Sequence, residues 1–193
     1  MPARPATSLS LSLLVLCLAL PMAGCMRLSS RQADQPDRDR VYSGLVGKWR
    51  GTLEVQPAGA AAGAVEPDEV PTEVMVRPAP DRDGLSLQFR YRDVFGRGVT
   101  NERHLHFNKT LTLAEWETVE HGRRDAYEVV SQSGGGTVPL RLVLEADGTA
   151  DARPARIRET IEVTPGAVEV TQEARKPGES FTFRHRYRLR RAE

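Results

Sequence analysis

Gly44-Leu45-Val46-Gly47-Lys48-Trp49-Arg50-Gly51-Thr52-Leu53-Glu54-Val55 is the stretch of sequence from which we predict the fold. Glycine has no Cβ, so Gly47 and Gly51 allow the backbone to bulge or to approach another segment closely. Trp49, which lies between them, offers the large apolar surface of an aromatic ring for packing. We therefore expect Trp49 to plug one end of a small barrel whose first strand covers residues 49–55.

After this stretch, apolar and polar residues alternate in one short segment after another. Side chains two residues apart share one face of a strand, so the alternation predicts half-buried strands. Turn residues such as Asp83-Gly84 separate them, and residues 41–46 are expected to form one short helical turn. The predicted strands cover residues 49–55, 72–77, 85–91, 103–107, 111–119, 126–131, 138–145, 156–163, 167–174 and 180–190.

Antiparallel strands joined by tight turns in a single domain are typical of an all-β sandwich or barrel. The succession of hairpins favours a single antiparallel up-and-down β-barrel of about nine or ten strands, because closure leaves no exposed strand edge. We predict this barrel over residues 41–193. Residues 56–71 are rich in Ala, Gly and Pro, which predicts a disordered loop there.

The N-terminal segment has the features of an export signal. Arg4 precedes an apolar run from Leu9 to Leu20, which is shorter than the roughly 20 residues that span a bilayer. The run ends in Leu20-Pro21-Met22-Ala23-Gly24-Cys25, which resembles the lipobox of bacterial lipoproteins. The resemblance implies a signal peptide over residues 1–24 and acyl chains on Cys25, and the polar residues 25–40 would be a flexible tether. The alternative is a secreted protein with a chance cysteine.

The lipoprotein resemblance also implies a location. Acyl chains stabilise membrane binding by about 0.8 kcal/mol per buried methylene, so Cys25 would anchor the protein firmly in a lipid membrane. Met26 follows the cysteine, whereas the family pattern uses aspartate to retain a lipoprotein in the inner membrane. We expect a cell-envelope protein on the outer membrane, facing the periplasm.

The composition excludes several functions. Cys17 would leave with the signal and Cys25 would be acylated, so no thiol remains for a disulfide, a zinc site or a nucleophile. Removal of Arg4 with the signal peptide would reduce the 27 basic residues to 26, which equals the number of acidic residues. The resulting net charge of zero gives no general attraction to nucleic acid. The sequence has no Gly-x-Ser-x-Gly, P-loop or His-Glu-x-x-His pattern, so we predict no enzymatic activity.

Gly47-Lys48-Trp49 resembles the Gly-x-Trp signature of lipocalins and their calycin relatives. The resemblance implies that Trp49 closes one end of the barrel while an arginine near the C-terminus packs across it. Arg190 is the expected partner, and Arg188 and Arg191 are also available for this cation–π contact.

The aromatic residues suggest a ligand in the lumen. Phe183, His185 and Tyr187 alternate on one face of the last predicted strand, and Phe181 and Leu189 share that face. A small apolar ligand is our first prediction, but the same residues would also fill a packed barrel that acts as an envelope interaction module through its loops. The expected lining residues are Phe89, Tyr91, Phe183, His185 and Tyr187, with Leu85 and Leu87 beside them.

Gly47, Trp49 and Gly51 also resemble the Gly-x-Trp-x-Gly-x-Gly start of nitrobindins, although Leu53 replaces the last glycine. The resemblance implies a haem-binding barrel in which His185, on the last strand, is the axial ligand. Haem binding is the alternative prediction. Our first prediction is that the protein has no cofactor and that His185 is a hydrogen-bonded residue of the core.

His104 and His106 lie two residues apart, so they could hold one metal ion with Glu102 or His121. Leu105 and Phe107 are the apolar residues of the same strand and are expected on its core side, which turns His104 and His106 toward solvent. This favours solvated histidines and no metal. On the last strand, the remaining pattern is a ladder of arginines that could bind an anionic partner or be neutralised by Glu169 and Glu173. The ladder comprises Arg184, Arg186, Arg188 and Arg190.

Overall fold

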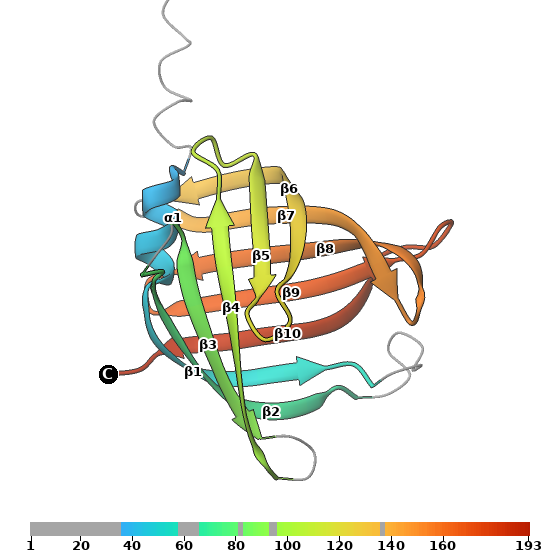
Figure 1. The fold of residues 1–193 in the computed structure, drawn as a ribbon, viewed down its shortest axis with the longest axis horizontal. Helices are drawn as coiled ribbons and strands as arrows, with labels where there is room; N and C mark the ends of the chain where they lie inside the picture. The colour runs from blue at the N-terminus through green and yellow to red at the C-terminus, as the bar shows by residue number, and fades with distance from the viewer. Residues whose placement is uncertain (1–35, 58–65, 81–82, 93–95, 136–137) are drawn as a thin grey trace, which may run out of the picture.

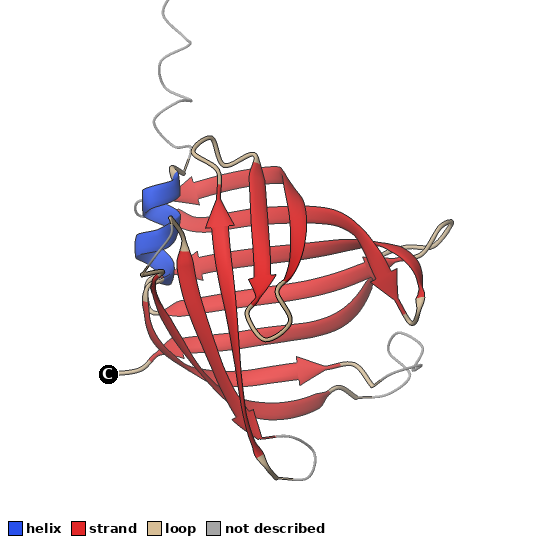
Figure 2. Ribbon diagram, viewed as in Figure 1, coloured by secondary structure: helices blue, strands red, loops and turns tan. Residues whose placement is uncertain are grey.

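Ten antiparallel strands and one helix make up the part of the chain that the structure, a computed structural model, describes: residues 36–57, 66–80, 83–92, 96–135 and 138–193. Successive strands pair with one another and β1 pairs with β10, which closes the barrel (Figures 1 and 2). The predicted single up-and-down barrel is confirmed. The elements are α1 (Arg38–Leu45), β1 (Gly47–Val55), β2 (Asp68–Pro78), β3 (Leu85–Arg92), β4 (Gly98–Phe107), β5 (Leu113–Thr118), β6 (Arg123–Gly135), β7 (Val138–Ala150), β8 (Arg153–Thr164), β9 (Ala167–Arg175) and β10 (Thr182–Arg191).

Several predicted boundaries change. Residues 68–71, assigned to the disordered loop, begin β2, because β1 offers them backbone partners as far as the pair Val55 and Asp68. Residues 58–65 of that loop lie outside the described residues, as do the predicted signal peptide and Cys25. β6 continues through Gly134, which sits at a bulge with φ +81° where a Cβ would lie 1.7 Å from the Pro139 carbonyl oxygen.

The helix covers one end of the barrel (Figure 1). Asp37 caps it, since its side chain accepts a hydrogen bond from the Arg40 amide at 2.8 Å. Val41 and Leu45 are buried against the core, and the hydroxyl of Tyr42 accepts from the Phe107 amide at 2.9 Å. The helical turn predicted at residues 41–46 thus begins three residues earlier. None of the helices in the described ranges has the length and apolarity needed to cross a bilayer.

Trp49 lies at this helix-covered end, with 2 % of its surface exposed, and its indole Nε1 donates to the Leu45 carbonyl at 2.8 Å. Arg191, and not the predicted Arg190, packs over it, with the guanidinium carbon 4.7 Å from the ring centroid. The register explains the difference, because Arg191 is directly opposite Trp49 whereas Arg190 is opposite the exposed Arg50. A Cβ on Gly47 would lie 2.9 Å from the Arg191 Nη1, so this glycine makes room for the guanidinium.

The helix-covered half of the barrel is packed. Its largest fully buried side chains come from strands on opposite walls and meet in the lumen. The cavity left among them, here called the inner cavity, has a volume of about 40 Å³. A water molecule in the liquid occupies about 30 Å³, so the inner cavity has little room for a ligand. The fully buried side chains include Leu85, Leu105, Phe107, Leu142, Leu144 and Ile161.

Candidate ligand site at the open end of the barrel

A pocket of about 410 Å³, here called the mouth pocket, lies at the end of the barrel away from α1. It is formed where β5 turns into β6 and where β7 and β9 end, so the loops and strand ends set its rim. Most of its lining is polar, in contrast to the inner cavity. The lining residues are Arg103, Thr118, Arg123, Arg124, Asp125, Ala126, Tyr127, Ala146, Asp147, Gly148, Thr149, Ile157 and Gln172.

Arg103 lines both the mouth pocket and the inner cavity and so separates the two. On β4 it lies two residues before Leu105 and four before Phe107, so all three side chains share one face of the strand. Leu105 and Phe107 are 1 % and 0 % exposed, so this face is the lumen side and the side chain of Arg103 enters the lumen. Its guanidinium carbon lies 4.6 Å from the centroid of the Trp116 ring, a cation–π contact. Its Nε is buried without a hydrogen-bond partner.

Glu159 is the buried acid of the lumen, with 1 % of its surface exposed. Its Oε2 accepts from the Trp116 Nε1 at 2.6 Å, and its Oε1 accepts from the Gln172 Nε2 at 3.4 Å. Burial raises the pKa of this carboxyl, while the charge of Arg103 acts in the opposite direction. Glu159 therefore holds the tryptophan on which Arg103 stacks.

Tyr127 and Asp125 contribute the other polar groups of the mouth pocket. Tyr127 is 6 % exposed, and its burial, with the nearby Glu159 charge, raises the pKa of its phenol. The phenol therefore keeps its proton at neutral pH and can donate a hydrogen bond. Asp125 accepts from Arg123 at 2.9 Å, so its charge is already paired.

Four of the five predicted lining residues lie on the lumen side. Phe89 and Tyr187 line the inner cavity, with ring centroids 5.3 Å apart. Tyr91 packs against the core, and the His185 ring lies edge-on to Tyr187 at 5.7 Å. These residues help to fill the barrel; none of them lines the mouth pocket.

The predicted inward position of Phe183 is wrong. The strand has a register shift between Phe183 and His185, and such a bulge moves the residues on one side of it to the opposite face. Phe183 lies on the outer face, with the Arg186 guanidinium carbon 5.6 Å from its ring centroid. Phe181 is also outside, between Arg158 at 3.7 Å and Arg175 at 4.7 Å.

The residues around His185 do not fit a haem. A pocket for a drug-sized ligand has a volume of roughly 300–1,000 Å³. The inner cavity has about 40 Å³, and His185 lines neither it nor the mouth pocket. The haem alternative therefore gains no support from the geometry around His185.

His104 and His106 lie on the outer face, as Leu105 and Phe107 occupy the core side. His104 Nε2 is 3.4 Å from a Glu102 carboxylate oxygen, and His106 bonds the Asp83 carbonyl through its Nδ1. Within the described ranges, no three His, Cys, Asp or Glu side chains are arranged to hold a metal ion.

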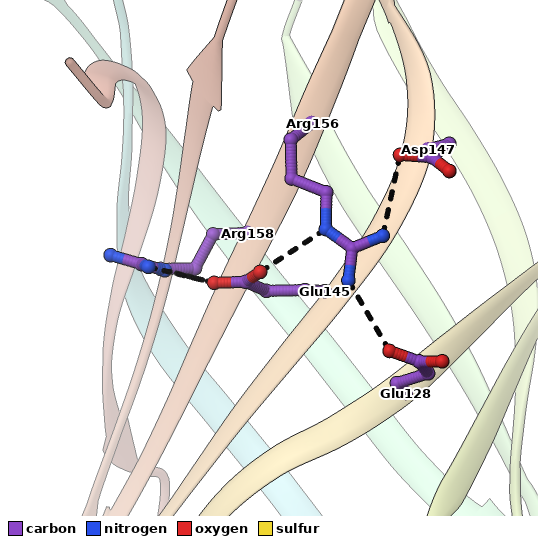
Figure 3. Close-up of polar contacts among 5 residues, drawn as sticks. All are labelled: Glu128, Glu145, Asp147, Arg156 and Arg158. Carbon is purple, nitrogen blue, oxygen red and sulfur yellow. Dashed lines mark hydrogen bonds and ion pairs between the residues drawn. The ribbon is translucent and has the colours of Figure 1, made fainter.

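The outer face is largely self-neutralised. Figure 3 shows Arg156 of β8 between Glu128, Glu145 and Asp147, while Glu145 also bonds Arg158 at 2.7 Å. On the arginine ladder, Arg186 and Arg188 both pair with Glu54 of β1, and Arg184 pairs with Asp151. Glu169, one of the two predicted partners, lies 3.8 Å from both Arg186 and Arg188. Arg184, Arg186 and Arg188 of the ladder thus form ion pairs within the protein.

Sequence reasoning missed Arg103 and Glu159, although the sequence carries a signal for both. Arg103 is two residues before Leu105, and Glu159 is two residues before Ile161, so alternation places each of them among core residues. A charged residue at a core position of a strand marks a place where the lumen is polar.

His185 makes stability depend on pH. Burial, with a smaller effect of the Arg103 charge, lowers its pKa to about 4. An unfolded histidine has a pKa of about 6.5, so between these values the unfolded chain binds a proton that the folded chain excludes. Acidification should therefore lower the free energy of unfolding by up to about 1.4 kcal/mol per pH unit in this window.

We expect His185→Gln to lose this contribution, so that wild type and variant differ more at pH 7 than at pH 4.5 in urea unfolding. The exposed His121, whose side chain is 75 % accessible, provides the control as His121→Gln, which should show a constant difference. A constant difference for His185→Gln as well would contradict the prediction.

No model of a known protein family matches this chain, and no curated protein shows significant similarity to it. The barrel is compatible with a lipocalin-like fold. The resemblances to lipoproteins and to nitrobindins stay predictions that rest on the quoted residues.

Proposed function

We propose that this chain is a non-enzymatic carrier that binds a small ligand in the mouth pocket and is anchored in the cell envelope through acylated Cys25. The observation that carries the proposal is the asymmetry of the lumen. One half is packed around an inner cavity of about 40 Å³, whereas the mouth pocket has about 410 Å³. The larger volume lies within the roughly 300–1,000 Å³ of pockets that hold small molecules.

The lining of the mouth pocket favours a ligand with a polar group over the wholly apolar ligand predicted from the sequence. Arg103, Tyr127 and Gln172 present donors at its wall. An apolar ligand would remove these groups from water without replacing their hydrogen bonds, which is unfavourable. Ile157 and Ala146 offer a smaller apolar surface beside them.

A carrier is favoured over an enzyme because the acids of the lumen are bonded to structural partners. Asp125 is paired with Arg123, and Glu159 accepts from Trp116. His185, the imidazole of the lumen, does not line the mouth pocket. The interaction module predicted as an alternative would use the loops and needs no pocket.

The experiment is a calorimetric titration of residues 26–193, which contain the whole barrel, with three molecules that share one naphthalene ring. They are 2-naphthoate, 2-naphthalenemethanol and 2-(aminomethyl)naphthalene. Ala146→Phe places a ring at the wall of the mouth pocket and should weaken binding at least tenfold. Leu113→Phe adds the same ring at a side chain that is 52 % exposed and should change nothing.

Binding of any of the three that Ala146→Phe weakens and Leu113→Phe does not would support the carrier. If none binds and the purified protein has only its bare chain mass in native mass spectrometry, the proposal fails and the interaction module is favoured. Binding that is equal in both variants would also contradict the mouth pocket as the site. Thermal unfolding of both variants verifies that each is folded.

A further inference from the structure

We propose that the ligand of the mouth pocket is a small monocarboxylate and that Arg103 is the residue that selects it. The inference rests on the proposed function, because it names the chemical class of the ligand that this pocket would carry. Arg103 lines both the mouth pocket and the inner cavity, so a ligand in the mouth pocket can reach its guanidinium where the two adjoin.

The guanidinium of Arg103 stacks on an aromatic ring but forms no ion pair with a side chain of the described residues, although its charge acts on the nearby Glu159. Trp116 packs against it, with 4.6 Å from the guanidinium carbon to the ring centroid, and this contact fixes its plane. Its Nε is buried without a hydrogen bond, and no ion pair within the described ranges joins it to a carboxylate. Most arginines of the outer face, in contrast, form ion pairs. A partly buried guanidinium that is stacked on an aromatic ring and has a buried Nε without an acceptor is suited to a carboxylate.

The acids near Arg103 do not take the place of a ligand. Glu159 accepts hydrogen bonds from Trp116 and Gln172, and burial favours its protonated form. Asp125 is paired with Arg123 at the rim. Each acid is therefore already bonded to another side chain, and the donors of Arg103 remain available to an incoming molecule.

A second donor supports the same class of ligand. The phenol of Tyr127 lines the mouth pocket and keeps its proton at neutral pH. A carboxylate has two oxygens, so it can accept from both the guanidinium and the phenol. Arg123 and Arg124 also line the mouth pocket, but Arg123 is paired with Asp125, and Arg124 with Glu115 and Glu117. Their charges are therefore largely neutralised, and the pocket lacks the cluster of unpaired positive charges that would stabilise a phosphate dianion, which favours a monoanion.

The test compares the affinities of the naphthalene series and adds 2-naphthyl phosphate. We expect 2-naphthoate to bind at least tenfold more tightly than 2-naphthalenemethanol, and the amine to bind more weakly than both. Arg103→Gln should remove the preference for the carboxylate while the alcohol still binds. Arg103→Lys, which keeps the charge but loses the planar fork, should retain part of the preference.

Arg141→Gln is the matched control, because Arg141 lies outside the barrel in an ion pair with Glu162, and it should leave all affinities within about twofold of the wild type. Tighter binding of the amine or of the phosphate than of the carboxylate would overturn the inference. Equal affinity for the acid and the alcohol would overturn it too, yet leave the carrier function intact. Loss of binding for all probes in the wild type would instead reject the carrier function itself.

Discussion

Gly51→Ala is expected to lower the free energy of unfolding by about 3 kcal/mol or more, because it blocks closure of the barrel. A Cβ at this position would lie 1.8 Å from the carbonyl oxygen of Arg188 and 2.8 Å from its carbonyl carbon. Both atoms belong to the backbone of β10, which pairs with β1 along seven residue pairs from Trp49 to Val55. Neither strand can move away without breaking this closing ladder. Urea unfolding monitored by circular dichroism measures the loss.

Gly98→Ala is the matched control, since Gly98 begins β4 and a Cβ there meets no atom within 4 Å. It should change stability by no more than about 0.5 kcal/mol, the usual range for a surface site. Similar effects of the two substitutions would show that a general property of glycine, and not the approach of β1 to β10, controls stability.

Trp49→Ala is expected to cost about 3–5 kcal/mol, the usual range for removal of a large aromatic side chain from a core. Trp49 is 2 % exposed, its indole donates to the Leu45 carbonyl, and Arg191 covers its ring. Its loss would open a cavity between β1 and α1. The measurement is again the free energy of unfolding in urea.

A comparison of Arg191→Ala with Arg190→Ala distinguishes the cation–π contact on Trp49 from a general effect of removing a positive charge. Arg191→Ala should cost about 0.5–1 kcal/mol, the range of such contacts for an exposed cation. Arg190→Ala should cost less, since Arg190 lies opposite Arg50 on the outer face. A larger loss for Arg190→Ala than for Arg191→Ala would contradict the register of β1 and β10.

Much of the fold could be predicted because alternation depends only on local sequence. Leu105 and Phe107 were expected in the core and are 1 % and 0 % exposed. The positions of the strands were also predicted, but their lengths were not. β7 and β8 extend to Ala150 and Arg153, beyond the predicted ends, because each provides hydrogen-bond partners for the other.

Less of the candidate site could be predicted. Phe183 was expected in the lumen, and the bulge before His185 moved it outside. Glu159 and Arg103 followed the alternation but were not recognised, because a charged residue in a strand is normally on the solvated face. The volumes of the mouth pocket and the inner cavity depend on how side chains from opposite walls meet, which no local pattern contains.

By itself, the sequence determined the number and approximate positions of the strands, the face that most residues present, and the place of Trp49 at the start of the barrel. These follow from the period of two and from residues near one another in the chain. Only the tertiary structure decided that Arg191 covers Trp49 and that Phe183 faces outward. It also decided that Arg103 lies between the packed half of the barrel, with its inner cavity, and the mouth pocket. The physical reason is that the register between β1, β10 and β9 is set by backbone pairing and bulges between segments distant in sequence, and a shift of one residue exchanges the two faces of a strand.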